Sequence, residues 1–370
     1  MSNLKWCRNC LNASTRPRIS FDKRGWCNAC QWMEEKRSID WDKREEMLLS
    51  IIGKHKRHGG PYDCIVAVSG GKDGSYVSHT LKTRYGLTPL CITVRPPLSL
   101  DIGDDNLKSF INSGYEHLLI SPNSSIMQKL DRIGFINFGQ GYYGWLISIH
   151  TAVLRIAERF GISLVFYSED GEIEYGGSTS RKNDPVYGVD YMRAAYLNST
   201  YEQAMTLASL GENDSYWFSF PDTLYEALSE IEVTHFSFYE NWDPYRNYLI
   251  AKEFCGMKEK EESSVGTFTN FSQTDQKLAA LHYYLMYLKF GFGRATQDAG
   301  IEIRRGSMSR DQAINLVKLY DDEIPVQFYE DYCNYYQLSR TEFEEILDKF
   351  ANKELFEKID GRWIAKFSIK

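Results

Sequence analysis

A glycine-rich loop directly behind a short apolar run constrains the fold more than any other part of the chain. The run is Cys64-Ile65-Val66-Ala67-Val68, and the loop is Ser69-Gly70-Gly71-Lys72-Asp73-Gly74-Ser75. A β-branched strand that ends in small residues and opens a helix aims several backbone N–H groups and a helix N-terminus at one point, where they can hold phosphate. The pattern therefore predicts an α/β fold that binds a nucleotide at this turn. A glycine-rich turn that binds no ligand is the alternative.

The loop differs from a Walker A loop, because a valine stands where the first glycine would be and Asp73 follows Lys72. It resembles the PP-loop of the ATP pyrophosphatases, Ser-Gly-Gly-x-Asp-Ser followed by Ser or Thr, whose members split ATP between the α- and β-phosphates. The resemblance implies that the loop backbone holds pyrophosphate, that Lys72 offsets its charge and that Asp73 helps to hold Mg²⁺. Gly74 replaces the usual serine, so a hydroxyl contact has to come from Ser69 or Ser75.

The composition agrees with a soluble intracellular enzyme. A chain of 370 residues can bury a large core and suggests one large domain with appendages, or two domains. Its net charge of −7 disfavours broad electrostatic capture of nucleic acid, so no nucleic-acid partner is expected. The sequence shows neither a membrane-spanning apolar stretch nor a signal-peptide core, so we expect no membrane partner and a cytoplasmic location.

Four of the eight cysteines form two closely spaced pairs near the N-terminus. The pairs are Cys7-x-x-Cys10 and Cys27-x-x-Cys30, with sixteen residues between them. This spacing allows two tight turns to present four thiolates tetrahedrally to Zn²⁺. Four thiolates complete the coordination shell, so the predicted zinc is structural rather than catalytic. Disulfide bonds are the alternative interpretation, which a reducing compartment disfavours.

The chain divides into four predicted parts. They are a zinc ribbon at 1–35, a linking helix at 36–60, an ATP-binding α/β domain at 61–320 with an insertion at about 179–232, and a helical C-terminal region at 321–370. Strands are predicted at 64–68, 89–94, 117–120, 163–167 and 233–239, and helices at 75–84, 104–112, 126–133, 145–160 and 244–253. Such alternation predicts a mostly parallel sheet with helices on both faces and ligand beyond the carboxyl ends of the strands. The PP-loop resemblance implies a HUP-like sheet of five parallel strands.

Two further segments carry chemistry. In the acidic segment 167–177, Glu169 and Asp170 follow a predicted strand, where carboxylates suit a Mg²⁺ shell or a proton acceptor beside ATP. A solvated turn is the alternative there. The basic segment 289–306 places Lys289 and Arg294 among glycines. Cations at such a helix end can bind polyphosphate or a nucleotide sugar, or can simply complete a helix C-terminus.

A dinucleotide-binding fingerprint, Gly139-Gln140-Gly141-Tyr142-Tyr143-Gly144, precedes a predicted helix. The fingerprint is a weak signal by itself, and the strand that should precede it, around 134–138, is short and flanked by glycine. A nicotinamide or flavin enzyme therefore stays an alternative, beside a glycine-rich turn with a local role.

Taken together, the motifs resemble the N-acetyl sugar amidotransferases, which make acetamidino sugars for surface polysaccharides and flagellin glycans in bacteria. The resemblance runs almost from end to end and rests on both cysteine pairs with Thr15-Arg16-Pro17 between them, Ile39-Asp40-Trp41, the loop at 69–75, Glu174-Tyr175-Gly176-Gly177, Trp242-Asp243-Pro244 and the block at 289–306. The usual Trp-Gly-Glu-Asn is Tyr167-Ser168-Glu169-Asp170 here, so Glu169 is retained and Asp170 departs from the pattern.

The resemblance implies an ATP-dependent C–N ligase of lipopolysaccharide or glycan biosynthesis that forms AMP and pyrophosphate. The acetamido oxygen of an activated N-acetyl sugar would attack the α-phosphate of ATP, and ammonia would displace AMP from the O-adenylyl imidate to leave an acetamidine. Lys72, Asp73 and Glu169 are the predicted catalytic residues, with Glu169 binding Mg²⁺ or taking a proton from the incoming ammonium. The predicted nucleotide-binding residues are Ser69, Gly70, Gly71, Lys72, Asp73, Gly74, Ser75, Thr93, Lys289 and Arg294.

The sequence offers no evident means of making ammonia, because residue 2 is not the cysteine of an N-terminal nucleophile and no Gly-x-Cys-x-Gly elbow is present. The resemblance implies delivery by a separate glutaminase that works with a cyclase-like barrel subunit. Two other functions stay open. A PP-loop tRNA-modifying enzyme, of the thiolase or lysidine-synthetase type, would bring a basic RNA surface. A non-enzymatic zinc-ribbon adaptor would need no PP-loop.

Overall fold

The computed structural model describes residues 4–56, 60–222 and 231–369. Its centre is a six-stranded sheet with the strand order β3-β2-β1-β4-β6-β5. The strands are β1 (Cys64–Ala67), β2 (Pro89–Val94), β3 (His117–Ile120), β4 (Leu164–Tyr167), β5 (Val186–Tyr187) and β6 (Glu232–His235). All neighbouring strands are parallel except β5 and β6.

The predicted parallel strands are confirmed, but the predicted count of five is wrong because antiparallel β5 extends the sheet at its edge. With two residues, β5 is too short to show an alternating pattern in the sequence. β6 also ends earlier than predicted, at His235. There the chain turns into a 3₁₀ helix, η5 (Phe236–Phe238), in which the N–H of Ser237 donates to the carbonyl oxygen of Ser168 across 2.9 Å.

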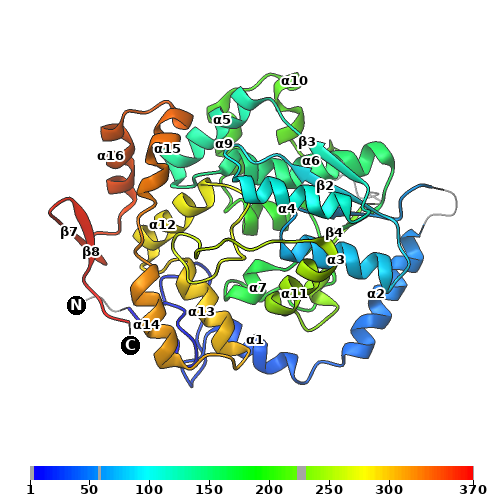
Figure 1. Cartoon of the computed structure of the whole chain (residues 1–370), viewed down its shortest axis with the longest axis horizontal. Coiled ribbons are helices and arrows are strands. Elements are labelled where there is room, and N and C mark those ends of the chain that lie inside the picture. Colours follow the sequence, from blue (N-terminus) through cyan, green and yellow to red (C-terminus); the bar gives the residue numbers. More distant parts are fainter. Residues whose placement is uncertain (1–3, 57–59, 223–230, 370) are drawn as a thin grey trace.

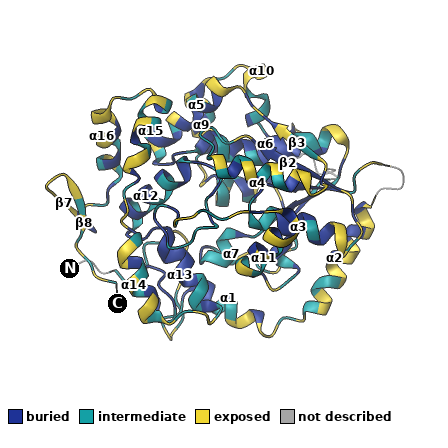
Figure 2. Cartoon of the chain, viewed as in Figure 1, coloured by how far each residue is buried: buried dark blue, intermediate teal, exposed yellow. Residues whose placement is uncertain are grey.

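Helices cover both faces of the sheet (Figure 1). One face packs against α5 (Ser124–Ile133), α6 (Tyr143–Phe160) and α9 (Tyr201–Ala208). The other packs against α2 (Trp41–His55), α3 (Lys72–Thr83), α4 (Asp101–Asn112) and α11 (Pro244–Cys255). Leu48, Ile51 and Ile52 form the buried stripe of α2, whose opposite side is exposed (Figure 2). The linking helix predicted at 36–60 begins at Trp41 and ends at His55 in the structure, and residues 57–59 of the predicted range lie outside the described residues.

Shorter elements connect these layers, and a second, mostly helical core follows them. The segment after β4 contains α7 (Gly171–Tyr175), α8 (Val189–Tyr191), the π-helix η2 (Met192–Tyr196), α10 (Glu212–Ser215) and the 3₁₀ helix η3 (Tyr216–Phe218). The C-terminal part contains α12 (Leu278–Phe290), α13 (Arg294–Arg304), α14 (Arg310–Tyr320), η6 (Val326–Phe328), α15 (Tyr329–Tyr336), α16 (Arg340–Phe350) and the hairpin of β7 (Phe356–Ile359) and β8 (Arg362–Ala365). A cluster of aromatic and leucine side chains joins α12, α15, α16 and the hairpin.

The segment that would precede a dinucleotide site as a strand is instead the π-helix η1 (Gly134–Phe138), which continues α5. Gly139 then turns the chain with a φ of +61° toward α6. The fingerprint at 139–144 is therefore a turn between two helices and lacks the strand on which dinucleotide binding depends.

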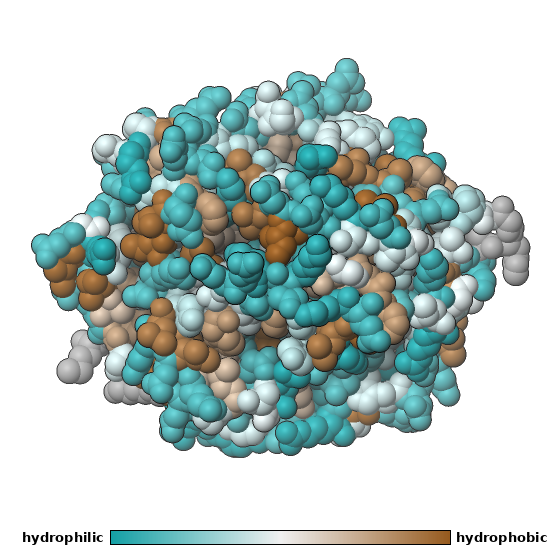
Figure 3. All heavy atoms as spheres, in the orientation of Figure 1, coloured by the Kyte–Doolittle hydropathy of each residue, from teal (hydrophilic) through white to brown (hydrophobic). Residues whose placement is uncertain are grey.

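The face drawn in Figure 3 is mostly hydrophilic, with small hydrophobic patches between hydrophilic residues. Within the described ranges, no helix combines the length and the apolar character that crossing a bilayer requires.

Candidate functional site

The glycine-rich loop joins the end of β1 to the first residue of α3. Gly70 has a φ of +79°, and a Cβ atom at this position would lie 2.4 Å from the backbone nitrogen of Leu107 on α4. Glycine alone suits both the backbone conformation and this close approach. The N-terminus of α3 lies beside the carboxyl ends of β1 and β4, where the strand order reverses and α/β sheets commonly bind ligands.

A cavity of about 370 Å³ opens at this point, which we call the first cavity. Its walls come from the loop, from the ends of β2 and β4, from α4, α6, α12 and α13, and from the segment before α12. Among the residues predicted from the sequence, the first cavity brings together Ser69, Gly71, Lys72, Asp73, Gly74, Thr93, Glu169 and Arg294.

Lys72 and Asp73 form an ion pair in the first turn of α3. Burial lowers the pKa of Lys72, but the charges of Asp73 and Glu169 outweigh burial and raise this pKa overall, which keeps the lysine cationic. Asn247, fully buried on α11, donates from Nδ2 to Oδ1 of Asp73 across 3.0 Å. Asn247 was not predicted from the sequence, and the only signal for it there is its position one turn after the helix-capping residue Asp243.

Glu169 follows β4 and lines the first cavity together with residues of the loop. The hydroxyl of Tyr175 donates to its Oε1 across 3.0 Å. Burial and the charge of Asp73 raise the pKa of Glu169 to about 7, although Lys72 acts in the opposite direction. A carboxyl group with this pKa can exchange a proton near neutral pH, and together with Asp73 it offers the hard oxygen ligands that Mg²⁺ prefers.

Thr93 holds the end of β1 in place. Its hydroxyl donates to the carbonyl oxygen of Val68 across 2.7 Å, and Nε2 of His117 lies 2.8 Å from the same hydroxyl. Burial lowers the pKa of His117 to about 4, so the ring is neutral at physiological pH. Thr93 therefore positions the strand from which the loop begins.

The two cations predicted at 289–306 lie in different places. Arg294 begins α13 in the wall of the first cavity, where its Nε pairs with Oδ1 of Asp298 across 2.9 Å and its Nη1 donates to the hydroxyl of Tyr283 across 3.3 Å. Lys289 lines another cavity, and its Nζ donates to the carbonyl oxygen of Gly139 across 2.9 Å. The structure thus separates two side chains that the sequence groups together.

The two serines of the loop, Ser69 and Ser75, differ in their access to the first cavity. Ser69 lines the first cavity, whereas Ser75 is fully buried and its hydroxyl has no hydrogen-bond partner among the described residues. Ser69 is therefore the serine placed to meet a ligand. A Cβ atom on Gly74 would lie 2.9 Å from the carbonyl oxygen of Ala67, so close contact between α3 and β1 accounts for glycine at this position.

The other acids of the segment 167–177 make structural contacts. Asp170 caps α7 by accepting a hydrogen bond from the N–H of Glu172 across 2.9 Å. The side chains of Asp170, Glu172 and Glu174 bond to those of Tyr191, Arg18 and Lys36, respectively. Of the four acids in this segment, Glu169 alone lines the first cavity.

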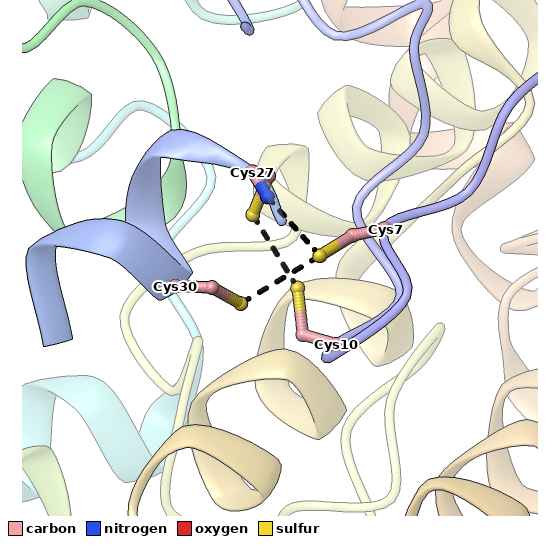
Figure 4. Close-up of side chains that lie close together, drawn as sticks. All are labelled: Cys7, Cys10, Cys27 and Cys30. Carbon is pink, nitrogen blue, oxygen red and sulfur yellow. Dashed lines mark hydrogen bonds between the residues drawn. The ribbon is translucent and has the colours of Figure 1, made fainter. Parts of the chain in front are cut away.

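The four cysteines predicted to bind zinc come together at the N-terminal end of α1 (Asn28–Lys36). Their sulfur atoms all lie within 4.8 Å of one another (Figure 4). The Sγ–Sγ distance is 3.7 Å between Cys7 and Cys30 and 3.6 Å between Cys10 and Cys27. These distances far exceed the roughly 2.05 Å of a disulfide bond. They approach the ~3.8 Å between two sulfur ligands of a tetrahedral ion with metal–sulfur distances of about 2.3 Å, so the geometry fits one metal ion.

Amide donors surround the sulfur atoms. Nδ2 of Asn9 donates to Sγ of Cys30, and Nδ2 of Asn12 donates to Sγ of Cys27, each across 3.3 Å. Hydrogen bonds of this kind orient metal-bound thiolates and stabilise their charge. The donor set therefore also fits a metal centre.

Comparisons with known proteins find similarity to parts of the chain. The family model described as "LPS biosynthesis protein WbpG-like, C-terminal domain" matches residues 265–368. "Uncharacterized protein MJ1599" of Methanocaldococcus jannaschii is 34% identical over 89 residues, which make up 24% of this chain and 32% of that protein. The chain thus spans about a third of the length of this curated relative.

A solved structure, "U34-tRNA thiolase NcsA from Methanococcus maripaludis with its [4Fe-4S] cluster", has a TM-score of 0.33 at 14% identity and covers 83% of this chain and 88% of that one. The sequence match at 265–368 includes α12 and α13, which carry Lys289 and Arg294. The C-terminal part of the chain is therefore similar to the C-terminal domain of a lipopolysaccharide biosynthesis protein.

Proposed function

We propose that this chain is an ATP-dependent amidotransferase that converts the acetamido group of an activated bacterial sugar into an acetamidino group. The observation that carries the proposal is the first cavity, where Lys72 and Asp73, at the N-terminus of α3, meet Glu169 and Arg294. A helix N-terminus with a lysine suits phosphate, and neighbouring carboxylates suit a divalent cation. The similarity of residues 265–368 to a lipopolysaccharide biosynthesis domain supports a sugar as the acceptor.

The reaction takes two steps. The acetamido oxygen attacks the α-phosphorus of ATP, and pyrophosphate leaves with the electron pair of the bond to its bridging oxygen. Ammonia then adds to the imidate carbon, and AMP leaves with the electron pair of the C–O bond as the nitrogen gives up a proton. Lys72, Arg294 and the N–H groups of the loop stabilise the negative charge of pyrophosphate. A Mg²⁺ ion held by Asp73 would neutralise further phosphate charge.

Glu169 is the group that we assign to the proton of the incoming nitrogen. It lies in the first cavity with Lys72 and Asp73, and its raised pKa gives it an affinity for protons that an ordinary glutamate lacks at neutral pH. The hydrogen bond from Tyr175 fixes the direction of its carboxyl group.

We assign the ammonia to a separate glutaminase that works with a cyclase-like barrel subunit. The residues that line the first cavity in the described part of the chain include no cysteine. The described lining of this cavity therefore offers no thiol nucleophile, on which glutamine hydrolysis would depend.

The cysteine centre is proposed to hold Zn²⁺ in a structural role. All four cysteines are buried, and four thiolates leave no coordination position for substrate. In this proposal the metal stabilises the N-terminal segment and takes no part in the chemistry at ATP.

Pyrophosphate release from ATP, in the presence of ammonium, tests the proposed function with three groups of acceptors. These are UDP-linked acetamido sugars, CMP-linked nonulosonates and bulk tRNA. We expect release that depends on a sugar, with a product mass that shows replacement of one oxygen by NH. Release that depends on tRNA would identify a tRNA-modifying enzyme instead, and no release with any acceptor would favour an adaptor.

The substitution Asp73→Ala should abolish this release while the zinc content stays unchanged. Asp105→Ala is the matched control, because Asp105 is an exposed carboxylate on α4 that does not line the first cavity. Release that survives Asp73→Ala would contradict the role assigned to the loop.

A further inference from the structure

A second cavity, of about 460 Å³, lies beside the first. The segment that connects the two cysteine pairs contributes Arg16 and Arg18 to its lining, and the end of α12 contributes Lys289. Its volume falls within the range of sites for small organic ligands. The proposed chemistry at the loop does not use these three cations.

The charges in the second cavity are unbalanced. Arg16, Arg18 and Lys289 carry positive charge, whereas Glu172 is the only acid in the described lining. Glu172 is already engaged, because Nε and Nη2 of Arg18 each donate to its carboxylate across 2.7 Å. The hydrogen bonds of Lys289 go to carbonyl oxygens, which carry no net charge. Two positive charges are thus left without a carboxylate partner in the lining.

The two unbalanced cations are poorly solvated. Nε of Arg16 is buried and has no hydrogen-bond partner among the described residues. Burial lowers the pKa of Arg16 to about 10 and that of Lys289 to about 8, so both groups bear a desolvation cost in their charged forms. A bound anion would offset this cost and accept the unused N–H of Arg16.

Aromatic rings complete the second cavity. The rings of Phe290 and Phe292 lie with their centroids 6.0 Å apart at an angle of 25°, and the guanidinium of Arg16 lies over Phe292 at 5.7 Å. Aromatic faces beside cations suit a ligand that carries both an apolar ring surface and a negative charge.

The two cavities share a wall. Three elements, α7, α12 and the turn before α6, contribute residues to both cavities. Those in the first cavity include Tyr175, Tyr283 and Tyr142, and those in the second cavity include Glu172, His282 and Gln140. The rings of Tyr142 and His282 stack across this wall, with centroids 4.6 Å apart at 29°. A ligand in the second cavity is therefore held next to the cavity that contains Glu169.

We propose that the second cavity binds the phosphate group that activates the sugar, through Arg16 and Lys289, and thereby holds the sugar next to the first cavity, on the other side of the Tyr142–His282 pair. This inference rests on the proposed function and adds the place of the acceptor. The two substrates then occupy adjoining cavities, ATP at the loop and the phosphorylated sugar at the cationic cavity.

Equilibrium binding to the full chain tests the proposal, with the first cavity saturated by α,β-methylene ATP. The probes are UDP, CMP and N-acetylglucosamine 1-phosphate, which share a phosphate and differ in the attached group. We expect at least one probe to bind. Arg16→Gln and Lys289→Gln should each weaken that binding at least tenfold and change the affinity for the ATP analogue less than twofold. Lys129→Gln, which removes an exposed cation of α5 outside both linings, should change neither affinity.

The proposal is wrong if no probe binds while the first cavity is filled, or if Lys289→Gln and Arg16→Gln leave probe binding unchanged. Each variant is first compared with the unaltered chain by circular dichroism, and either folded variant suffices for the test. Failure of the proposed function is a separate result. In that case the probes still bind and the substitutions still weaken their binding, but no acetamido sugar elicits pyrophosphate release.

Discussion

The side-chain amide of Asn12 donates one hydrogen bond to the backbone carbonyl oxygen of Tyr175, across 3.0 Å, and another to the sulfur of Cys27, across 3.3 Å. One residue thus connects the cysteine centre to α7, the helix that follows Glu169. α1, which carries Cys30, packs on α7 as well. The cysteine centre therefore supports the segment that places Glu169 and Tyr175 in the first cavity.

Replacing Asn12 by alanine should weaken metal retention and lower pyrophosphate release together. The substitution removes the donor to the carbonyl of Tyr175, and the loss of a hydrogen bond at this partly buried position costs about 1 kcal/mol. Metal loss to a chromophoric chelator and release by the metal-loaded variant measure the two effects. Asn9→Ala is the matched control, because Asn9 donates to Cys30 and this hydrogen bond does not involve α7. Asn9→Ala should weaken metal retention but leave pyrophosphate release unchanged. Equal pyrophosphate release by the two metal-loaded variants would show that the position of α7 does not depend on Asn12.

Glu169→Gln should slow turnover about 100-fold or more, since general bases commonly contribute that much. In the unaltered chain, turnover should rise with pH through about 7, where the pKa of Glu169 lies because of burial and the charge of Asp73. The glutamine variant should lose this rise. An unchanged pH profile in Glu169→Gln would exclude Glu169 as the base.

The same carboxyl group should affect stability, which gives a readout independent of activity. The pKa of Glu169 is raised from 4.5 to about 7 in the folded chain, so between these pH values the folded state binds more protons than the unfolded state. The free energy of unfolding should therefore fall as pH rises through this window. Denaturant titrations of the unaltered chain and Glu169→Gln should show a smaller fall in the variant.

The sheet, the loop and the cysteine centre were accessible from the sequence because each depends on local patterns. Apolar runs predicted the parallel strands, and the spacing of the cysteines predicted four sulfur atoms at one point. The remaining contacts of the candidate site form between residues that are distant in the sequence. Asn247 reaches Asp73 only because α11 packs on α3, and no local pattern records that contact.

The basic segment shows the same limit more sharply. Lys289 belongs to the last turn of α12, and Arg294 begins α13 after Gly291 has turned the chain with a φ of +77°. Lys289 and Arg294 are only five positions apart in the sequence, but their side chains line two different cavities. The cations of this segment predicted one anion site, whereas the structure places Lys289 and Arg294 in the linings of different cavities because the chain turns between the two helices.

Asn247→Asp should shift the pH profile of pyrophosphate release to higher pH. The change places a second carboxylate against Asp73, and like charges at this distance raise the pKa of one of the two groups. Below that pKa the pair holds a proton and binds Mg²⁺ less well. Release measured against pH should recover in alkaline solution for Asn247→Asp and should stay low at every pH for Asp73→Ala. A profile identical to that of the unaltered chain would show that Asn247 does not face Asp73 in solution.

Gly70→Ala should destabilise the chain by about 2–5 kcal/mol and abolish binding of the ATP analogue. The estimate combines the cost of a left-handed backbone with that of a forced contact against Leu107. Gly86→Ala measures the backbone cost without the contact, because Gly86 has a φ of +65° and open space around its Cβ position. It should cost about 1–2 kcal/mol and leave binding intact. Equal effects of the two substitutions on unfolding in urea would exclude the contact with α4 as the constraint.

Gly74→Ser introduces the serine that is usual in the PP-loops that this loop resembles, and the resemblance alone would predict tighter ATP binding. The structure predicts the opposite. A Cβ atom would lie 2.9 Å from the carbonyl oxygen of Ala67 and from Cα of Val68, so the start of α3 would have to move away from β1 at a cost of about 1–3 kcal/mol. Gly53→Ser, on α2 with open space around its Cβ position, should be neutral or slightly stabilising. Unfolding in urea and affinity for α,β-methylene ATP measure both effects. Tighter binding by Gly74→Ser would mean that close packing of α3 on β1 is not the reason for glycine at this position.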